Sequence, residues 1–162
     1  MKDLDLLEVI EKNAKVSNQD LATILEKDEA WILETLNDLE KQKIIGGYHT
    51  IINWDKTTVD QVTAIIYVDA IPQRDSGYDR LAKRIYNYPE VESMYLTSGS
   101  SDFMLMMKAR TMKEIANFVA TKLACIEGVS ATSTLLVLQT YKAHNVIMCE
   151  EERTPERLLV TP

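Results

Sequence analysis

The apolar residues in the first third of the chain recur every three or four positions, the spacing that gathers side chains on one face of a helix. Three such stripes predict helices at Asp3–Asn13, Ser17–Glu26 and Asp28–Lys43. The side chains expected to face a shared core are Leu6, Leu7, Ile10, Leu21, Ile24, Leu25, Ile32, Leu33, Leu36 and Leu39, with Ile44 and Ile45 closing it. This part of the chain is therefore predicted to form a small helical unit.

Polar residues and glycines mark where these helices begin and end. Ser17, followed by Asp20, is a variant of the capping box, and Asp28 suits the N-cap of the third helix. The pair Gly46–Gly47 permits a sharp turn into an extended segment at Tyr48–Ile52. Two short helices, a tight turn and a following ribbon have the spacing of a winged helix-turn-helix. The second helix of that motif normally enters the DNA major groove.

After residue 61 the pattern changes to alternating strands and helices. Segments rich in β-branched and aromatic residues predict strands at Val62–Asp69, Val91–Thr97, Phe103–Ala109 and Val129–Lys142. Helical stripes lie at Tyr78–Tyr88 and Thr111–Ile126, stopped by Pro89 and Gly128. This order is the ferredoxin-like split βαββαβ. Its helices cover one face of the sheet, and a second copy of the sheet is the simplest cover for the other.

The expected fold class is α+β, with four successive parts. Residues 1–53 form a winged helix-turn-helix, 54–61 a polar linker, 62–148 a ferredoxin-like oligomerisation and effector-binding domain, and 149–162 an acidic tail. Ala143–Met148 is expected to add a further short strand. Leu158–Val160 in the tail is expected to be disordered or to dock on a partner subunit.

The acidity of the chain is concentrated in the part that would face DNA. Residues 1–55 contain six lysines, no arginine and twelve acidic residues, a formal charge of −6, whereas the whole 162-residue chain carries −7. Non-specific affinity for a duplex comes from lysines and arginines that displace counterions condensed on the phosphates. The motif therefore indicates DNA, while the charge argues against strong binding to it.

Composition narrows the remaining classes of function. No apolar run approaches the ~20 residues of a membrane span, and the N-terminus lacks the apolar stretch of a signal peptide. We therefore expect a cytoplasmic protein with no membrane partner. Cys125 and Cys149 are far apart and are expected to be reduced thiols. His49 and His144 are too isolated for a metal site, and no catalytic motif occurs. We expect no enzyme activity, metal or cofactor.

Four stretches are typical of one family when their order and spacing are taken together. They are Val16–Asn18 with Leu21-Ala22, Leu39–Tyr48 through Asn53, a Gly-x-x-Asp-aromatic turn at Ser98–Phe103, and Glu127–Val129 in place of Pro-Gly-Val. The chain, from about Asp3 to Met148, resembles the leucine-responsive (Lrp/AsnC) regulators. The resemblance implies a transcriptional regulator of amino-acid metabolism that dimerises through its C-terminal sheets and assembles into tetramers or octamers. It also implies a small effector, usually an amino acid, bound in the C-terminal domain between dimers.

The chain departs from the family pattern in four places. Where the recognition helix usually carries arginines, this chain has Glu34, Thr35, Asn37 and Asp38. Glu26 replaces a glycine in the turn between the two helices, where a left-handed conformation is mildly costly. Ser100 stands where an acid or similar polar group usually follows the effector-loop glycine, and the N-terminal Leu-Asp start is shortened. The missing arginines bear most directly on DNA recognition.

The third helix offers side chains that could read DNA. Asn37 can pair with adenine in the major groove, and Glu34 or Asp38 can accept from the cytosine amino group. The alternative is an ordinary solvated helix that no longer reads DNA. We predict a palindromic double-stranded site, bound weakly if the charge dominates. The predicted contacts are Lys27, Trp31, Thr35, Asn37, Lys41, Lys43 and His49.

The resemblance places the effector at the loop Gly99–Phe103. A turn rich in serine and glycine exposes backbone N–H groups that can hold a carboxylate, and Asp102 can hold an ammonium group. Hydroxyls are expected on a facing strand. The alternative is a tight hairpin turn whose aspartate caps its own backbone. The predicted effector-binding residues are Gly99, Ser100, Ser101, Asp102, Phe103, Thr132, Ser133 and Thr134.

The leading hypothesis is a homo-oligomeric DNA-binding transcriptional regulator tuned by a small amino acid. The alternative is an amino-acid-sensing oligomerisation module whose winged-helix unit has lost DNA affinity and serves as a scaffold or pairs with a more basic paralogue. A third hypothesis, an enzyme built on the ferredoxin-like half, is opposed by the absence of catalytic residues.

Overall fold

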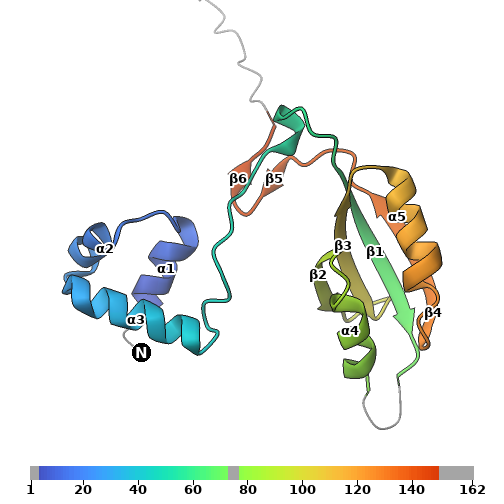
Figure 1. The fold of residues 1–162 in the computed structure, drawn as a ribbon, viewed down its shortest axis with the longest axis horizontal. Coiled ribbons are helices and arrows are strands. Elements are labelled where there is room, and N and C mark those ends of the chain that lie inside the picture. The colour runs from blue at the N-terminus through green and yellow to red at the C-terminus, as the bar shows by residue number, and fades with distance from the viewer. Residues whose placement is uncertain (1–3, 73–76, 150–162) are drawn as a thin grey trace, which may run out of the picture. The chain divides into compact units, whose positions relative to one another are not determined.

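The computed structural model describes residues 4–72 and 77–149, which fall into two compact units (Figure 1). The first is Met1–Ile51 and the second is Ile52–Pro162, and each has its own hydrophobic core. The predicted linker, residues 54–61, belongs to the second unit and begins with the 3-10 turn η1 (Trp54–Lys56). The predicted tail from residue 150 onward, with Leu158–Val160, lies outside the described residues.

The first unit is built from the three predicted helices. They are α1 (Leu4–Lys12), α2 (Asn18–Leu25) and α3 (Glu29–Lys41), around a core of Leu6, Leu21, Ile32 and Leu39. Three predicted core residues are wrong: Ile24 is 57% exposed, Leu33 is 48% exposed and Ile44 is 55% exposed. Neighbouring helical residues point about 100° apart, so a small core admits Ile32 and excludes Leu33. All three mispredicted side chains lie on the surface of the unit.

The residues predicted to cap α2 and α3 stand at the starts of these helices. The Asp20 backbone N–H donates to Ser17 Oγ at 3.1 Å, and the Ser17 hydroxyl donates to Asp20 Oδ2 at 2.7 Å. Asp28 occupies the N-cap of α3, although its side chain makes no capping hydrogen bond. Glu26 has φ 51° and ψ 47°, the left-handed conformation expected of its place in the turn.

The end of α3 explains why no wing ribbon forms within one chain. Lys43 is left-handed with φ 60°, and the N–H groups of Ile44 and Ile45 donate to the Leu39 carbonyl at 3.0 and 3.2 Å. Because residues 42–45 are used in ending the helix, the single extended segment after Gly46 is all that remains for a wing. A β-ribbon needs two such segments. None of the described residues of this unit is in a strand. The Tyr48 hydroxyl instead donates to Glu40 Oε1 at 2.9 Å, which holds the segment against α3.

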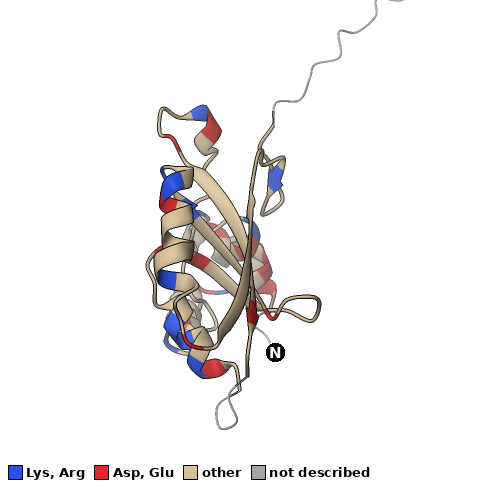
Figure 2. Ribbon diagram, turned by 90° about the vertical axis from the view of Figure 1, so that its right-hand side faces the viewer, with Lys and Arg blue, Asp and Glu red and all other residues tan. Residues whose placement is uncertain are grey.

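The second unit has the predicted ferredoxin-like topology. Its elements are β1 (Val62–Ala70), α4 (Asp79–Tyr86), β2 (Val91–Leu96), β3 (Phe103–Ala109), α5 (Met112–Phe118) and β4 (Val129–Leu136). The sheet order is β2-β3-β1-β4, and all neighbouring strands are antiparallel. Both helices pack on the same face of the sheet (Figure 2). That face and the helices share a core made of Ala64, Ile66, Val68, Leu81, Ile85, Phe103, Leu105, Met107, Ile115, Phe118, Leu123 and Ile126.

The opposite face of the sheet carries a second set of apolar side chains. Strand residues alternate between faces, so the residues that alternate with the core point away from the helices. They include Ile65, Tyr67, Tyr95, Met104, Met106 and Leu135, of which Tyr95 and Leu135 are about half exposed. We call this set the open face.

The single helix predicted at Thr111–Ile126 is wrong in its second half, where α5 passes into a π-helical turn, η2 (Val119–Leu123). The Ala124 N–H donates five residues back to the Val119 carbonyl at 2.9 Å. Phe118 and Leu123 are both buried, and a step of five residues turns a regular helix by 500°, which would place them on different faces. The wider turn brings both side chains back to the sheet.

The strand predicted at Val129–Lys142 is also too long, because β4 ends at Leu136. The Val137 N–H still donates to the Thr63 carbonyl at 2.9 Å, but β1 begins at Val62, so the chain beyond has no neighbour to pair with. The predicted short strand at Ala143–Met148 is a hairpin of β5 (Lys142–Ala143) and β6 (Val146–Ile147). Within the described ranges no helix is long and apolar enough to cross a bilayer.

Candidate DNA-reading helix and effector site

The outward face of α3 carries the predicted base-reading side chain, Asn37, which is exposed to solvent. The predicted contacts Lys27, Lys41, Lys43 and His49 are exposed as well. Trp31 and Thr35 are partly buried, and the Trp31 side chain packs against the core of this unit. Leu33, which the sequence pattern assigned to the core, instead joins the exposed surface of this helix.

The predicted cationic contacts lie at the two ends of α3. From Glu29 to Lys41 the helix rises about 18 Å at ~1.5 Å per residue, which exceeds the ~12 Å width of the major groove. Lys27 precedes the helix and stands 6.0 Å from the centre of the Trp31 ring, and Lys43 follows the helix. Cations so spaced suit phosphates on the two rims of a groove that holds Asn37.

Acidic groups oppose this arrangement. Lys41 Nζ lies 3.5 Å from Asp38 Oδ1 in an exposed pair, so part of its charge is already balanced. Glu34 is exposed one turn earlier on the same helix. Near the end of α3, partial burial and the hydrogen bond to Glu40 raise the pKa of the Tyr48 hydroxyl, which therefore stays a neutral donor. The surface can approach phosphates only at a few points.

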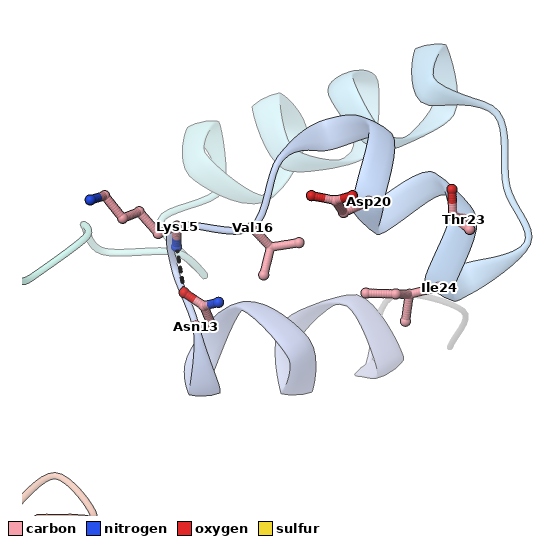
Figure 3. Close-up of a pocket in the computed structure, with 6 residues that line it drawn as sticks. All are labelled: Asn13, Lys15, Val16, Asp20, Thr23 and Ile24. Carbon is pink, nitrogen blue, oxygen red and sulfur yellow. Dashed lines mark hydrogen bonds between the residues drawn. The ribbon is translucent and has the colours of Figure 1, made fainter.

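A hollow of about 410 Å³ opens beside the connection between α1 and α2 (Figure 3). It is lined by Asn13, Lys15, Val16, Asp20, Thr23 and Ile24. The Lys15 N–H donates to Asn13 Oδ1 at 3.0 Å across its rim, and Asp20 is engaged by the Ser17 cap. None of the predicted DNA contacts lines the hollow, and its polar groups serve the local turns.

In the second unit, the predicted effector residue Asp102 is a hub of hydrogen bonds. Its Oδ1 accepts from the Tyr78 hydroxyl at 2.6 Å, and its Oδ2 accepts from the Ala70 N–H at 2.7 Å. Its own N–H donates to the Val68 carbonyl at 3.1 Å, and its carbonyl accepts from the Thr97 N–H at 2.8 Å. Asp102 therefore ties the loop to β1 and to the start of α4 rather than capping its own turn.

These contacts set the protonation of the pair. The hydrogen bond from Tyr78, together with that from the Ala70 backbone, lowers the pKa of the Asp102 carboxyl below its ordinary value. The same hydrogen bond to Asp102 is the main cause that raises the pKa of the Tyr78 hydroxyl. An ionised acceptor and a neutral donor are thus both favoured near neutral pH.

The loop between these contacts leaves its amides free. The Thr97 hydroxyl donates to the Ser101 carbonyl at 2.6 Å and closes the loop from the other side. Within residues 4–72 and 77–149, no acceptor is found for the backbone N–H groups of Gly99, Ser100 and Ser101. Gly99 and Ser100 are exposed. Successive free N–H groups on a held loop are suited to a carboxylate.

The other predicted effector residues are not placed against this loop. Phe103 is 2% exposed, and its ring packs edge-on against Tyr78 at 5.5 Å between centroids, so its side chain belongs to the core. In the ladder, Val68 of β1 pairs with Phe103 on one side and with Thr132 on the other. The strand expected to face the loop is thus two strands away, about 10 Å at the usual spacing.

Thr134 of β4 adjoins a different feature, a groove against α5. Thr134 pairs with buried Ile66 and points to the helix-covered side, whereas Ser133 pairs with Tyr67 and lies on the open face. A groove of about 580 Å³ runs between α5 and β4, lined on one side by Met112, Ala116, Val119 and Ala120 and on the other by Thr134 and Leu136. The sequence pattern did not reveal this groove, because apolar residues on the outer face of a helix cannot be distinguished in sequence from ordinary surface residues.

Tyr78 was also missed, since a tyrosine at a helix start has no distinguishing sequence signal. In the described part of the chain, no three His, Cys, Asp or Glu side chains come together as a metal ion would require. The two predicted sites therefore consist of an exposed helix face in the first unit and a held loop with a separate groove in the second.

Comparison with known sequences gives these sites a context. Residues 63–147 match a family model described as the Lrp/AsnC ligand binding domain. The chain is 33% identical to the HTH-type transcriptional regulator YugG of Bacillus subtilis, over 99% of this chain and 97% of YugG. It is 25% identical to the leucine-responsive regulatory protein of Haemophilus influenzae, over 90% of this chain and 87% of that protein.

Solved structures share the fold at lower identity. AsnC of E. coli matches with a TM-score of 0.66 and 21% identity, over 88% of this chain and 93% of AsnC. The regulator NMB0573 of Neisseria meningitidis, crystallised with L-Met, matches with a TM-score of 0.69 and 23% identity, over 88% of this chain and 91% of that one. With the extent of the YugG match and the family model, these similarities establish that the chain belongs to the Lrp/AsnC family of HTH-type transcriptional regulators.

Proposed function

We propose that the chain regulates transcription by placing α3 in the major groove of a two-fold symmetric DNA site. The observation that carries this proposal is the exposed Asn37 with cations at both ends of the helix, on a chain whose relatives are named regulators. The bases read would include adenine through the Asn37 amide. As a DNA-binding protein it would act where the chromosome is, in the cytoplasm.

The acidity of the first unit makes assembly important for this function. A single unit would contact few phosphates, whereas linked units raise the effective concentration of the second for its half-site. Half-sites are then expected one or more helical turns apart, because the subunits are related by two-fold symmetry. With about three cationic contacts per subunit, the affinity of a dimer should fall with salt with a logarithmic slope near −5.

Fluorescence anisotropy with fragments from upstream of the protein's own gene tests this, at low and at physiological salt. Asn37→Ala should weaken binding to the preferred fragment roughly tenfold and leave binding to unrelated DNA unchanged. Asn117→Ala, an exposed helical asparagine of the second unit, is the matched control and should change neither. Absence of binding to every fragment at low salt would favour the alternative, an assembly module without DNA affinity.

We also propose that a small amino acid is the effector and that two copies of the chain complete its site. The free amides at Gly99–Ser101 suit the carboxylate, and the groove beside Thr134 suits an apolar side chain. The loop and Thr134 lie on opposite sides of β1, so one copy does not close around a small molecule. The Neisseria structure with L-Met supports the class of ligand and not its identity.

Thermal shift with a panel of amino acids, followed by calorimetry, tests the effector. Thr134→Val should raise the dissociation constant of the best ligand severalfold, since it removes a hydroxyl from the groove. Ser133→Ala, on the same strand but on the open face, is the matched control. Loss of binding in Ser133→Ala with none in Thr134→Val would place the ligand on the open face instead.

The open face supports the proposal that the chain forms dimers, which assemble further into tetramers or octamers. Contiguous apolar side chains of this kind mark contact surfaces, and a second copy offers the same surface through a two-fold axis. Size-exclusion chromatography with light scattering, with and without the panel, measures the assembly. Met106→Lys should reduce its mass, whereas a monomeric wild type at micromolar concentration would refute the proposal.

A further inference from the structure

The loop proposed to bind the effector is held by a residue outside it. The span from Ser98 to Ser101 has no regular structure and is mostly exposed. Its shape therefore depends on what fixes its two ends. One end is Thr97, whose hydroxyl holds the Ser101 carbonyl, and the other is Asp102. Of the groups bonded to Asp102, three are backbone N–H or C=O groups of strands or the loop, and the fourth is the Tyr78 hydroxyl.

We propose that Tyr78 is a positioning residue of the effector site, acting through Asp102 on the amides of Gly99–Ser101. This inference rests on the proposed function of that loop. The Tyr78 hydroxyl is the one contact of Asp102 in the described structure that comes from a side chain, so a substitution can remove it without breaking the sheet.

The ring of Tyr78 is well placed for this role. It packs edge-on against Phe103, the residue that follows Asp102, with an angle of 82° between the rings. Because Phe103 is fixed in the core, it holds the Tyr78 ring from one side. The Tyr78 hydroxyl then lies 2.6 Å from Asp102 Oδ1 and donates to it. A hydrogen bond to an ionised carboxylate is stronger than one between neutral groups, so this contact should restrict the loop more than an ordinary one.

If Tyr78 holds Asp102 in this way, Asp102 takes part in binding by fixing the loop rather than by contacting the ligand. Both of its carboxylate oxygens already accept hydrogen bonds from the chain itself. Its main contribution is then to hold the loop, and the proposed ligand contacts are the free amides that follow Gly99. A protein that is competent to bind only in one loop conformation has a dissociation constant raised by the inverse of the competent fraction. Removal of the Tyr78 hydroxyl should therefore weaken binding without touching the ligand.

The test uses Tyr78→Phe in the full chain, with Tyr86→Phe as the matched control. Tyr86 is the last residue of α4, the helix that begins after Tyr78; it is 54% exposed, and its hydroxyl has no hydrogen-bond partner among the residues described. Calorimetry with the amino acid that stabilises the wild type most should give a three- to tenfold higher dissociation constant for Tyr78→Phe and no change for Tyr86→Phe. Hydrogen exchange should speed up severalfold at the hydrogen-bonded amides of Thr97 and Asp102, at the two ends of the loop, and remain unchanged in residues 112–126.

A double-mutant cycle separates positioning from general damage. If Tyr78 acts through Asp102, its replacement should have little further effect on binding in an Asp102→Asn background. Equal effects of Tyr78→Phe in both backgrounds, or unchanged exchange at the amides of Thr97 and Asp102, would overturn the proposal. If Tyr78→Phe does not fold, Asp102→Asn alone must accelerate exchange at the same two amides, and unaltered exchange there counts against the inference.

The proposed function and this inference fail separately. If the wild type binds no amino acid in the panel, the effector proposal is lost together with the claim that Tyr78 serves it. If the wild type binds and Tyr78→Phe binds equally well, the effector proposal stands and the positioning role is refuted.

Discussion

Glu26 lies in the turn that sets α2 against α3, and its replacement by glycine should stabilise the first unit. Its φ of 51° and ψ of 47° place it in the left-handed region, which costs an L-residue with a β-carbon about 1–2 kcal/mol. Glycine avoids that cost but loses about 0.4–1 kcal/mol through the greater freedom of its unfolded chain. The net expectation for Glu26→Gly is a gain of about 0.5–1 kcal/mol.

The charge of Glu26 must be separated from its backbone geometry. A negative charge at a helix C-terminus is unfavourable by a few tenths of a kcal/mol. Glu26→Ala removes the charge and keeps the β-carbon, so it should recover only that smaller amount. The difference between the glycine and alanine variants measures the strain of the left-handed turn.

The two tryptophans allow the first unit to be followed by itself. Trp31 packs in the first unit and Trp54 belongs to the second. In a Trp54→Phe background, fluorescence reports unfolding around Trp31. A gain of 0.5–1 kcal/mol should raise the midpoint of thermal unfolding by about 2–8 °C for a unit of this size. If Glu26→Ala stabilises as much as Glu26→Gly, or if the glycine variant is less stable than the wild type, the turn stores no strain and the reasoning is refuted.

Three further outcomes are expected. Gly128 has φ +100°, so Gly128→Ala should lower the stability of the second unit by about 1–3 kcal/mol in thermal denaturation. Gly99 has open space where a Cβ would lie, so Gly99→Ala should change the stability by less than about 0.5 kcal/mol. Because the pKa of Asp102 is lowered, its contribution to stability is present above the ordinary value of 3.8 and is lost as the pH falls below that value. Because the pKa of Tyr78 is raised, its contribution is present below 10.0 and is lost as the pH rises through the folded-state pKa. In a melting series from pH 3 to 11, Tyr78→Phe should therefore flatten the fall in stability at alkaline pH, and an unchanged fall would contradict the hydrogen bond. Asp38→Asn frees Lys41 from its ion pair and should raise the affinity for DNA. It should also steepen the slope of log affinity against log salt concentration by up to about one. Anisotropy at several salt concentrations measures this slope, and an unchanged slope would count against a phosphate contact at Lys41.

The sequence pattern predicted those parts of the fold that depend on local spacing. The Ser17 cap depends on a contact between residues three apart, and the left-handed Glu26 was expected because the family usually has glycine at that place. The alternation of strands and helices after Val62 likewise indicated the element order of a ferredoxin-like unit. Local spacing decides these elements, whereas the sheet order, in which β1 pairs with β3 and β4, is a property of the whole fold.

The errors arise where a distant segment decides the outcome. The end of β4 at Leu136 is set by where β1 begins, at Val62, and not by the β-forming residues that follow. Leu33 is exposed because Ile32 already fills a small core. Tyr78 and Asp102 are 24 residues apart and meet only when α4 and β3 are in place. The family resemblance could thus indicate a candidate effector loop, while the residue that holds this loop has no local sequence signal.

The wide turn at Val119–Leu123 has a consequence for the history of this chain. A hydrogen bond that spans five residues instead of four accommodates one extra residue without moving the segments on either side. Relatives in which this helix is regular throughout should therefore be one residue shorter here, and an alignment should show a single gap between positions 119 and 123. Removing exposed Ala120 would recreate that shorter form, with Phe118 and Leu123 still directed at the sheet.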